Sequence, residues 1–163
     1  MALADRIAVL ASGRIIQNGS PEEIYRKPAT LQVAQLFGDP SINTAPAVIE
    51  MKSGRPSVHV GGADIALDAS VAKHAGRKVT FGVRPEAIAI GKPGKGMSAE
   101  VMAITPLNER VVLLLKTRND WEVLASLPSS TSTLPEYGST VGISFAAAGT
   151  HVFDAETGEL LDG

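Results

Sequence analysis

The stretch KVTFGVRPEAI, residues 78–88, carries the strongest structural signal in the chain. Val79, Phe81 and Val83 alternate with smaller or polar residues, which is the period of a β-strand that buries one face. Pro85 follows at once, and its ring fixes the backbone angle and interrupts strand pairing. The sequence therefore predicts a buried strand over residues 78–84 that ends in a sharp bend.

Short segments of the same kind continue on both sides of this strand, separated by Gly, Pro, Asn and Ser. The predicted strands are 47–51, 57–60, 64–67, 78–84, 97–105, 110–117, 122–127, 141–145 and 150–153. Residues 111–115 are apolar without alternation, which is typical of a strand covered on both faces. Residues 70–74 predict a helical turn and residues 129–135 a loop. This pattern of short strands separated by turn residues favours a mainly β fold, either a barrel or a sandwich.

The residues before Pro40 have a different character, so we place a domain boundary there and predict an α+β segment over 1–40 and a β domain over 41–163. Two apolar runs, 6–11 and 14–17, are joined by Ser and Gly and predict a hairpin. Its apolar face, formed by Ile7, Val9 and Ile15, is expected to lack cover, so this segment should be mobile or pack against a second copy of the chain.

Two short helices are predicted after the hairpin. Ser20, Pro21 and Glu23 form a capping box that starts a helix ending near Arg26. Thr30 starts the second helix. The residues expected to share its buried face are Val33, Leu36 and Phe37.

The bulk composition narrows the classes of partner. The chain of 163 residues has 15 basic and 17 acidic side chains, a formal net charge of −2, so we predict neither nucleic acid nor acidic lipid as a partner. It has no Cys, which suits a reducing compartment such as the cytoplasm. The apolar runs are too short to cross a bilayer, so no direct membrane insertion is expected.

Three ordered blocks of sequence resemble the ATP-binding subunits of maltose-type and glycerol-phosphate-type ABC importers. The blocks are ALADRIAVL at 2–10 with GRI at 13–15, GSPEEIY at 19–25 and PA at 28–29; GVRPEAI at 82–88; and FDAETG at 153–158. The resemblance implies that residues 1–40 are the end of an ATPase core and residues 41–163 an OB-like transport-associated (TOBE) domain. Residues 1–5 are accordingly expected to be the tail of a helix that starts upstream.

The resemblance also implies a function. The chain would be an accessory, regulatory and dimerisation region, not an enzyme by itself, within a bacterial sugar-class importer. ATP and magnesium would belong to the parent ATPase, and this chain would hold no cofactor. Its partners would be a second copy of itself and the inner-membrane permease subunits, which would place it in the cytoplasm, peripheral to the inner membrane.

The sequence contains no recognisable catalytic or metal-binding motif. The string GKPGKGMS at 91–98 lacks the phosphate-loop Lys, since Met97 stands at that position, and Pro93 removes a backbone N–H from a loop that works by donating such groups. We interpret it as a polar turn. His59, His74 and His151 are too scattered for metal-ligand spacing, so no metal or catalytic site is predicted.

Six residues remain as candidate structural or partner-contact positions: Arg84, Pro85, Glu86, Asn108, Glu109 and Trp121. Arg84 is expected to pair with Glu86 or a neighbouring carboxylate and to fix the bend, a structural role that we favour over a partner contact. Family members often have a Glu at the position of Thr105 and a Gly near Asn108, so the loop that contains Asn108 and Glu109 is the least transferable part. Trp121 is either an exposed anchor or, as we prefer, a packing residue.

Two other functions stay open at this level. OB folds bind single-stranded nucleic acid through basic grooves and stacking aromatics, but aromatic residues make up only 4% of this chain. A sensor of small oxyanions is the second alternative. Its site would be lined by Gly61, Gly62, Thr80 and Arg84.

Overall fold

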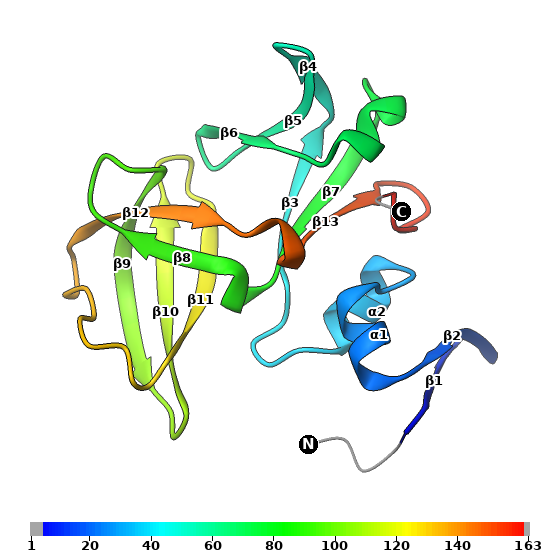
Figure 1. Ribbon diagram of the computed structural model, residues 1–163, viewed down its shortest axis with the longest axis horizontal. Helices are drawn as coiled ribbons and strands as arrows, with labels where there is room; N and C mark the ends of the chain where they lie inside the picture. Colours follow the sequence, from blue (N-terminus) through cyan, green and yellow to red (C-terminus); the bar gives the residue numbers. More distant parts are fainter. Residues whose placement is uncertain (1–4, 162–163) are drawn as a thin grey trace.

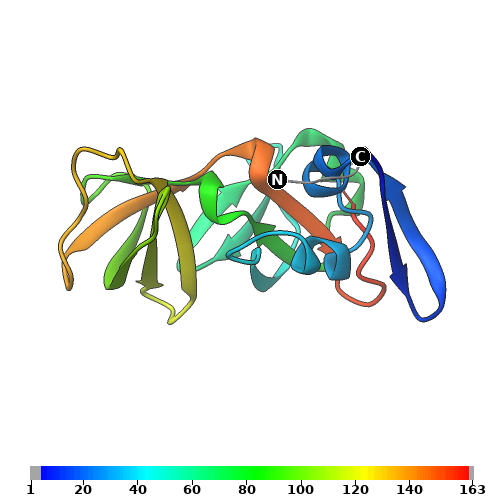
Figure 2. The same ribbon diagram turned by 90° about the horizontal axis from the view of Figure 1, so that it is seen from below.

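A computed structural model describes residues 5–161 of the chain (Figure 1). The predicted helix tail at residues 1–5 lies outside this range, apart from Asp5. In chain order, a β-hairpin, two short helices and a set of small β-sheets follow one another, and Figure 2 shows the hairpin and the five-stranded sheet at opposite ends of the molecule. The prediction of a mainly β fold with an N-terminal α+β segment is confirmed.

The N-terminal segment contains strands β1 (Ile7–Ala11) and β2 (Arg14–Gly19) and helices α1 (Pro21–Arg26) and α2 (Leu31–Leu36). The predicted capping box is present, because Ser20 and Glu23 each accept the other's backbone N–H. Thr30 caps α2 as predicted. No helix within residues 5–161 has the length and apolar character needed to cross a membrane.

The hairpin buries a different face from the predicted one. Its register shifts between Val9 and Leu10, so that Leu10 lies opposite Ile15 on the outer face, where they are 66% and 62% exposed. The inner face is formed by Val9 and Ile16, which pack with residues of both helices. The expectation that Val9 lacks cover within the chain was therefore wrong, as was the placement of Ile15 beside it.

The second helix also differs from its predicted face. Val33 and Ala34 are fully buried, whereas Leu36 is 66% exposed. Two adjacent residues define the inward side of so short a helix, and Leu36 then lies well off that side because successive residues turn by about 100°.

Between residues 41 and 161, the β domain contains eleven strands in three sheets. The strands are β3 (Asn43–Val48), β4 (Glu50–Lys52), β5 (Arg55–Val60), β6 (Ala63–Ala66), β7 (Lys78–Val83), β8 (Ile88–Gly91), β9 (Met97–Pro106), β10 (Arg110–Thr117), β11 (Glu122–Pro128), β12 (Thr140–Phe145) and β13 (Thr150–Asp154). The sheet orders are β11-β10-β9-β12-β8, β13-β7-β3 and β4-β5-β6. Short 3₁₀ helices η1 (Ala69–His74), η2 (Pro85–Ala87) and η3 (Ala147–Gly149) connect strands.

The predicted strands mostly agree with these bounds. Strand β10 has the predicted limits, and its centre is covered on both faces, with Val112 8% and Leu113 0% exposed. The prediction of a single strand over residues 47–51 was wrong. These residues divide between β3, which starts earlier, and β4. Strand β8 was missed. It spans four residues immediately after η2, too short for alternation to be recognised.

Strand β3 joins two sheets through one side chain. The Asn43 amide accepts from the Leu124 N–H at 2.7 Å and donates to the Leu124 carbonyl at 2.9 Å, so it behaves as a peptide group added to the edge of β11. It also donates to the Val83 carbonyl at 3.2 Å, while Trp121 Nε1 donates to the Thr44 carbonyl at 3.0 Å. These contacts cover part of a sheet edge that would otherwise be open.

Candidate functional site

Arg84 is the centre of the junction between the N-terminal segment and the β domain. It follows β7 and is only 1% exposed. Its Nη1 donates to the carbonyls of Ala34, at 2.8 Å, and Phe37, and its Nη2 donates to the Tyr25 carbonyl at 3.1 Å. The guanidinium therefore holds backbone groups at or near the C-terminal ends of both α1 and α2.

The position of the guanidinium follows from the chemistry of helix ends. The last carbonyls of a helix have no intrahelical partner and carry partial negative charge, which favours a cation beside them. The bend at Pro85 begins η2 and lets the Arg84 side chain leave β7 toward the helices. The predicted pairing of Arg84 with a carboxylate was wrong, since its guanidinium donates to three backbone carbonyls and forms no ion pair with a carboxylate among residues 5–161.

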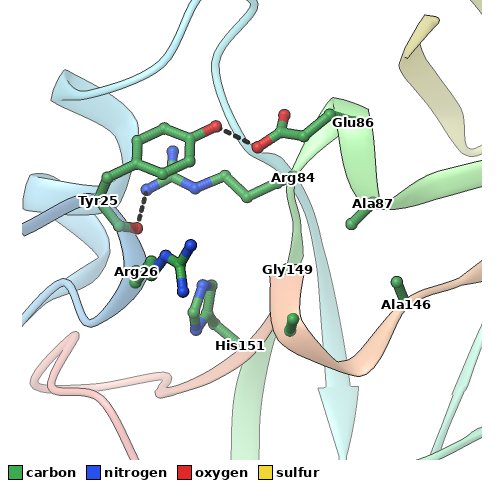
Figure 3. A pocket seen from close by; sticks show the side chains of 9 residues that line it. Tyr25, Arg26, Arg84, Glu86, Ala87, Ala146, Gly149 and His151 are labelled. Carbon is green, nitrogen blue, oxygen red and sulfur yellow. Dashed lines mark hydrogen bonds between the residues drawn. The ribbon is translucent and has the colours of Figure 1, made fainter. Parts of the chain in front are cut away.

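Tyr25 and Glu86 complete this contact, and we call Arg84, Tyr25 and Glu86 together the junction clamp. The Tyr25 ring lies over the guanidinium, with its centroid 4.1 Å from Cζ, and the Tyr25 hydroxyl donates to Glu86 Oε1 (Figure 3). Burial, with the Glu86 hydrogen bond and charge, raises the pKa of Tyr25 to about 12. The hydroxyl thus stays protonated and remains a donor at neutral pH.

Burial also lowers the pKa of Arg84. Guanidinium remains charged in proteins at neutral pH, so the charge itself is retained. The negative charge of Glu86 acts in the opposite direction and favours the charged form of Arg84.

A second set of contacts ties the C-terminal residues to the same N-terminal segment. The Leu31 N–H donates to the Gly158 carbonyl at 2.8 Å, and the Leu160 N–H donates to the Ala29 carbonyl at 3.1 Å. Leu31 and Leu160 also pack around the buried Phe153. The segment between the two helices is therefore paired with the chain end as in a small sheet.

The turn before this pairing is held by Asp154. Its Oδ1 accepts the N–H groups of Glu156 and Thr157, both at 2.9 Å. These hydrogen bonds, that of Thr157 first, lower the pKa of the Asp154 carboxyl, and Arg77 adds an ion pair at 3.2 Å. The turn predicted at 154–158 is thus confirmed, with Asp154 as its organising residue.

A pocket of about 410 Å³ opens beside the junction clamp. It is lined by Tyr25, Arg26, Arg84, Glu86, Ala87, Ala146, Ala148, Gly149 and His151. Figure 3 shows Arg84, Arg26 and His151 on one side of this space and the short side chains of Ala87 and Ala146 on the other. A Cβ at Gly149 would lie 2.3 Å from Ala87 Cβ, so only Gly lets η2 and η3 approach so closely.

The other predicted site residues lie elsewhere. Asn108 and Glu109 are exposed at the turn between β9 and β10, beside the ion pair between Arg110 and Asp39 at 2.8 Å. Asn108 does not have the positive φ that a Gly would supply, since the described non-Gly residues with positive φ are Ser12, Ser53 and Asp120. The turn between β9 and β10 therefore forms without a positive φ at Asn108.

Trp121 packs inside the β domain as preferred from the sequence. Its ring makes edge and tilted contacts with Phe81 and Phe145, with centroids 6.3 and 6.2 Å away. Its indole N–H donates a hydrogen bond to the Thr44 carbonyl. The contacts of Trp121 therefore favour the packing role over the role of an exposed anchor for a partner.

The oxyanion site expected from Gly61, Gly62, Thr80 and Arg84 is not assembled. The turn with Gly61 and Gly62 lies against Met97, Trp121 and Asn119, whereas Arg84 contacts the two helices. The sequence reasoning also missed Tyr25, Asn43, Gly149 and His151. Tyr25 had been noted only as the end of the GSPEEIY block at residues 19–25. Its contact with Arg84 leaves no local pattern, because the two residues are 59 positions apart.

Two family models match parts of the chain. Residues 38–88 match the family model of the MalK OB fold domain, and residues 81–153 match that of the TOBE domain. The sn-glycerol-3-phosphate import ATP-binding protein UgpC of Chromobacterium violaceum is 38% identical over 165 residues, covering 99% of this chain and 43% of that protein. UgpC of Escherichia coli is 31% identical over 161 residues, covering 99% and 44%.

A third relative is an uncharacterized ABC transporter ATP-binding protein, y4oS of Sinorhizobium fredii, which is 31% identical over all of this chain and 43% of its own length. The chain thus spans less than half the length of the curated relatives it matches. Among solved structures, the cytoplasmic molybdate-binding protein ModG superposes with a TM-score of 0.56 at 12% identity, covering 68% of this chain and 94% of ModG. At that identity the likeness concerns the fold alone.

Proposed function

This chain is a relative of the ATP-binding subunits of ABC importers, with a MalK OB fold segment and a TOBE domain, and we propose that it is the accessory and regulatory region of such a subunit. The observation that carries the proposal is that the match to these relatives covers 99–100% of this chain and so runs across the junction. The junction clamp supports it, because it joins the end of the ATPase-like segment to the β domain.

In this role the β domain would not hydrolyse ATP itself. The only string near a phosphate loop has Met97 in place of the required Lys, and Met97 is 5% exposed in the core of the β domain. Titration calorimetry of this chain with magnesium ATP should give no heat of binding, with a complete import ATPase as the positive control. A micromolar dissociation constant would contradict the proposal.

The proposed partner in solution is a second copy of the chain. Leu10 and Ile15 form an exposed cross-strand pair on the hairpin, and burial of such side chains is worth about 1.5–3 kcal/mol each. Light scattering of the purified chain at rising concentration should therefore show a dimer. A monomer at every concentration would refute the proposal.

Two variants locate the contact. The double variant Leu10→Ser and Ile15→Ser removes the exposed apolar pair, and Leu36→Ser is its matched control because Leu36 is equally exposed on α2. A dimer that is lost only in the double variant places the interface on the hairpin. A dimer that survives both variants places the interface in the β domain.

In the full subunit, we propose that this region lies at the cytoplasmic face of the inner membrane, where it is held by contacts with the permease subunits.

A further inference from the structure

The pocket beside the junction clamp brings together two guanidinium groups and an imidazole from separate parts of the fold. Arg26 comes from α1, Arg84 from the bend after β7 and His151 from β13, and all three line the same space of about 410 Å³. That volume lies in the usual range for sites of small ligands. We propose that this pocket binds the phosphate or carboxylate group of a small metabolite, between Arg84, Arg26 and His151.

Arg84 supplies the buried part of the site. A guanidinium has five N–H groups, and three of those of Arg84 are used by the carbonyls of Tyr25, Ala34 and Phe37. Its Nε is buried and has no hydrogen-bond partner among residues 5–161. The edge of the guanidinium that carries Nε faces the side on which Arg26 and His151 lie (Figure 3). A buried charged donor without an acceptor is costly, and the positive charge of this guanidinium, which lines the pocket, would attract an anion there.

Arg26 supplies the exposed positive charge of the proposed anion site. Its ion pair with Glu22, at 3.0 Å, joins side chains that are 72% and 71% exposed, and such surface pairs contribute little. The side chain can therefore turn from Glu22 to a ligand at small cost. Figure 3 shows it directed toward His151, whose residue is 4% exposed.

The acidic group in the lining does not oppose an anion strongly. Glu86 accepts a hydrogen bond from the Tyr25 hydroxyl, and Figure 3 shows its carboxylate turned to that ring, away from Arg26 and His151. The far wall consists of small side chains, Ala87, Ala146 and Ala148, with Gly149. This leaves room for an apolar or hydroxylated body beyond the acid group, which fits a phosphomonoester or a small carboxylic acid.

The binding is a property of the chain alone and goes beyond the proposed accessory function. It would survive a finding that the chain is monomeric or unconnected to a permease. It also differs from an oxyanion site at Gly61 and Gly62, which lie against other residues.

The test is a titration of the ¹⁵N-labelled chain with methyl phosphate and, separately, with acetate, at constant ionic strength. We expect saturable shifts of the amide signals of residues 25–26 and 146–151. A response to methyl phosphate alone assigns a phosphate ester, a response to acetate alone assigns a carboxylate, and both support the site. Shifts confined to other residues, or no saturable shift with either anion up to about 10 mM, would overturn it.

A pair of variants makes the test specific. Arg26→Gln removes one exposed charge that takes no part in the junction clamp, and should weaken binding about tenfold, the loss expected for one charged hydrogen bond. Arg55→Gln is the matched control, because Arg55 is an exposed Arg at the start of β5 and does not line the pocket. Equal affinities of the two variants would refute the assignment, and their spectra without ligand report whether both remain folded.

Discussion

Replacement of Arg84 by Met should loosen the N-terminal segment from the β domain. Met keeps the length of the aliphatic stem and removes the guanidinium, so the change isolates the hydrogen bonds of the junction clamp from its packing. Three hydrogen bonds from a charged donor are lost, each worth about 1.5–3 kcal/mol. The cost of burying the charge, which is several kcal/mol, is lost as well.

The difference of these two terms gives an expected destabilisation of about 3 kcal/mol. For a chain of this size, that corresponds to a decrease of Tm of about 6–12 °C. Arg84→Lys should fall between Met and the parent, since Lys retains the charge but lacks the planar group that reaches three carbonyls. Arg55→Met, on an exposed strand start, should leave the Tm nearly unchanged.

Urea unfolding followed by the fluorescence of Trp121, the single Trp, measures the free energy of the β domain. Hydrogen exchange at the amides of Ile24 and Ala34, which are bonded within α1 and α2, measures the N-terminal segment. In Arg84→Met these amides should exchange faster, with a smaller change at Leu113 in the core of β10. An unchanged urea midpoint together with unchanged exchange at Ile24 and Ala34 would refute the role given to Arg84.

Three further changes test other contacts by the same unfolding measurement. Asn43→Asp keeps the volume but sets a carboxylate oxygen against the Leu124 carbonyl, so it should cost about 2–4 kcal/mol, and a parent-like midpoint would show that the edge of β11 does not need the amide. Gly149→Ala should cost about 1–3 kcal/mol because the new Cβ meets Ala87, and no loss would mean that η2 and η3 separate freely. The pKa of Asp154 is lowered in the folded chain, so its stabilisation is present above the ordinary Asp pKa and is lost as pH falls through the folded value; acid should therefore destabilise the parent more than Asp154→Asn, and equal pH profiles would contradict this.

Local sequence signals predicted most of the elements. The capping box at Ser20 and Glu23 and the alternation of Val79, Phe81 and Val83 involve residues a few positions apart, and each was confirmed. The hairpin was also found, but the shift of register at Val9 was not. A bulge depends on how two strands fit a third element, here the helices, and the run of apolar residues in each strand is compatible with either register.

The candidate site was predictable only in part, for a physical reason. Arg84, Pro85 and Glu86 form a charged bend that the sequence indicates, yet the partners of Arg84 are main-chain carbonyls about 50 residues away, which every residue type possesses. Backbone acceptors leave no trace in the side-chain pattern, so the reasoning turned to a carboxylate instead. His151 was missed for a similar reason, since an isolated His in a strand has no signature until the fold brings Arg26 beside it.

The proposed anion site and the junction are physically linked, because the same groups serve both. A ligand between Arg26 and His151 would touch α1 and β13 at once, and so would bind tightly only while the N-terminal segment is packed on the β domain. Binding would therefore stabilise the packed arrangement by RT ln(1 + [L]/Kd), about 2.7 kcal/mol at a hundredfold excess over Kd. That is close to the contribution of about 3 kcal/mol assigned to Arg84. Binding of a small metabolite with such an acid group would thus change how firmly the N-terminal segment is held to the β domain.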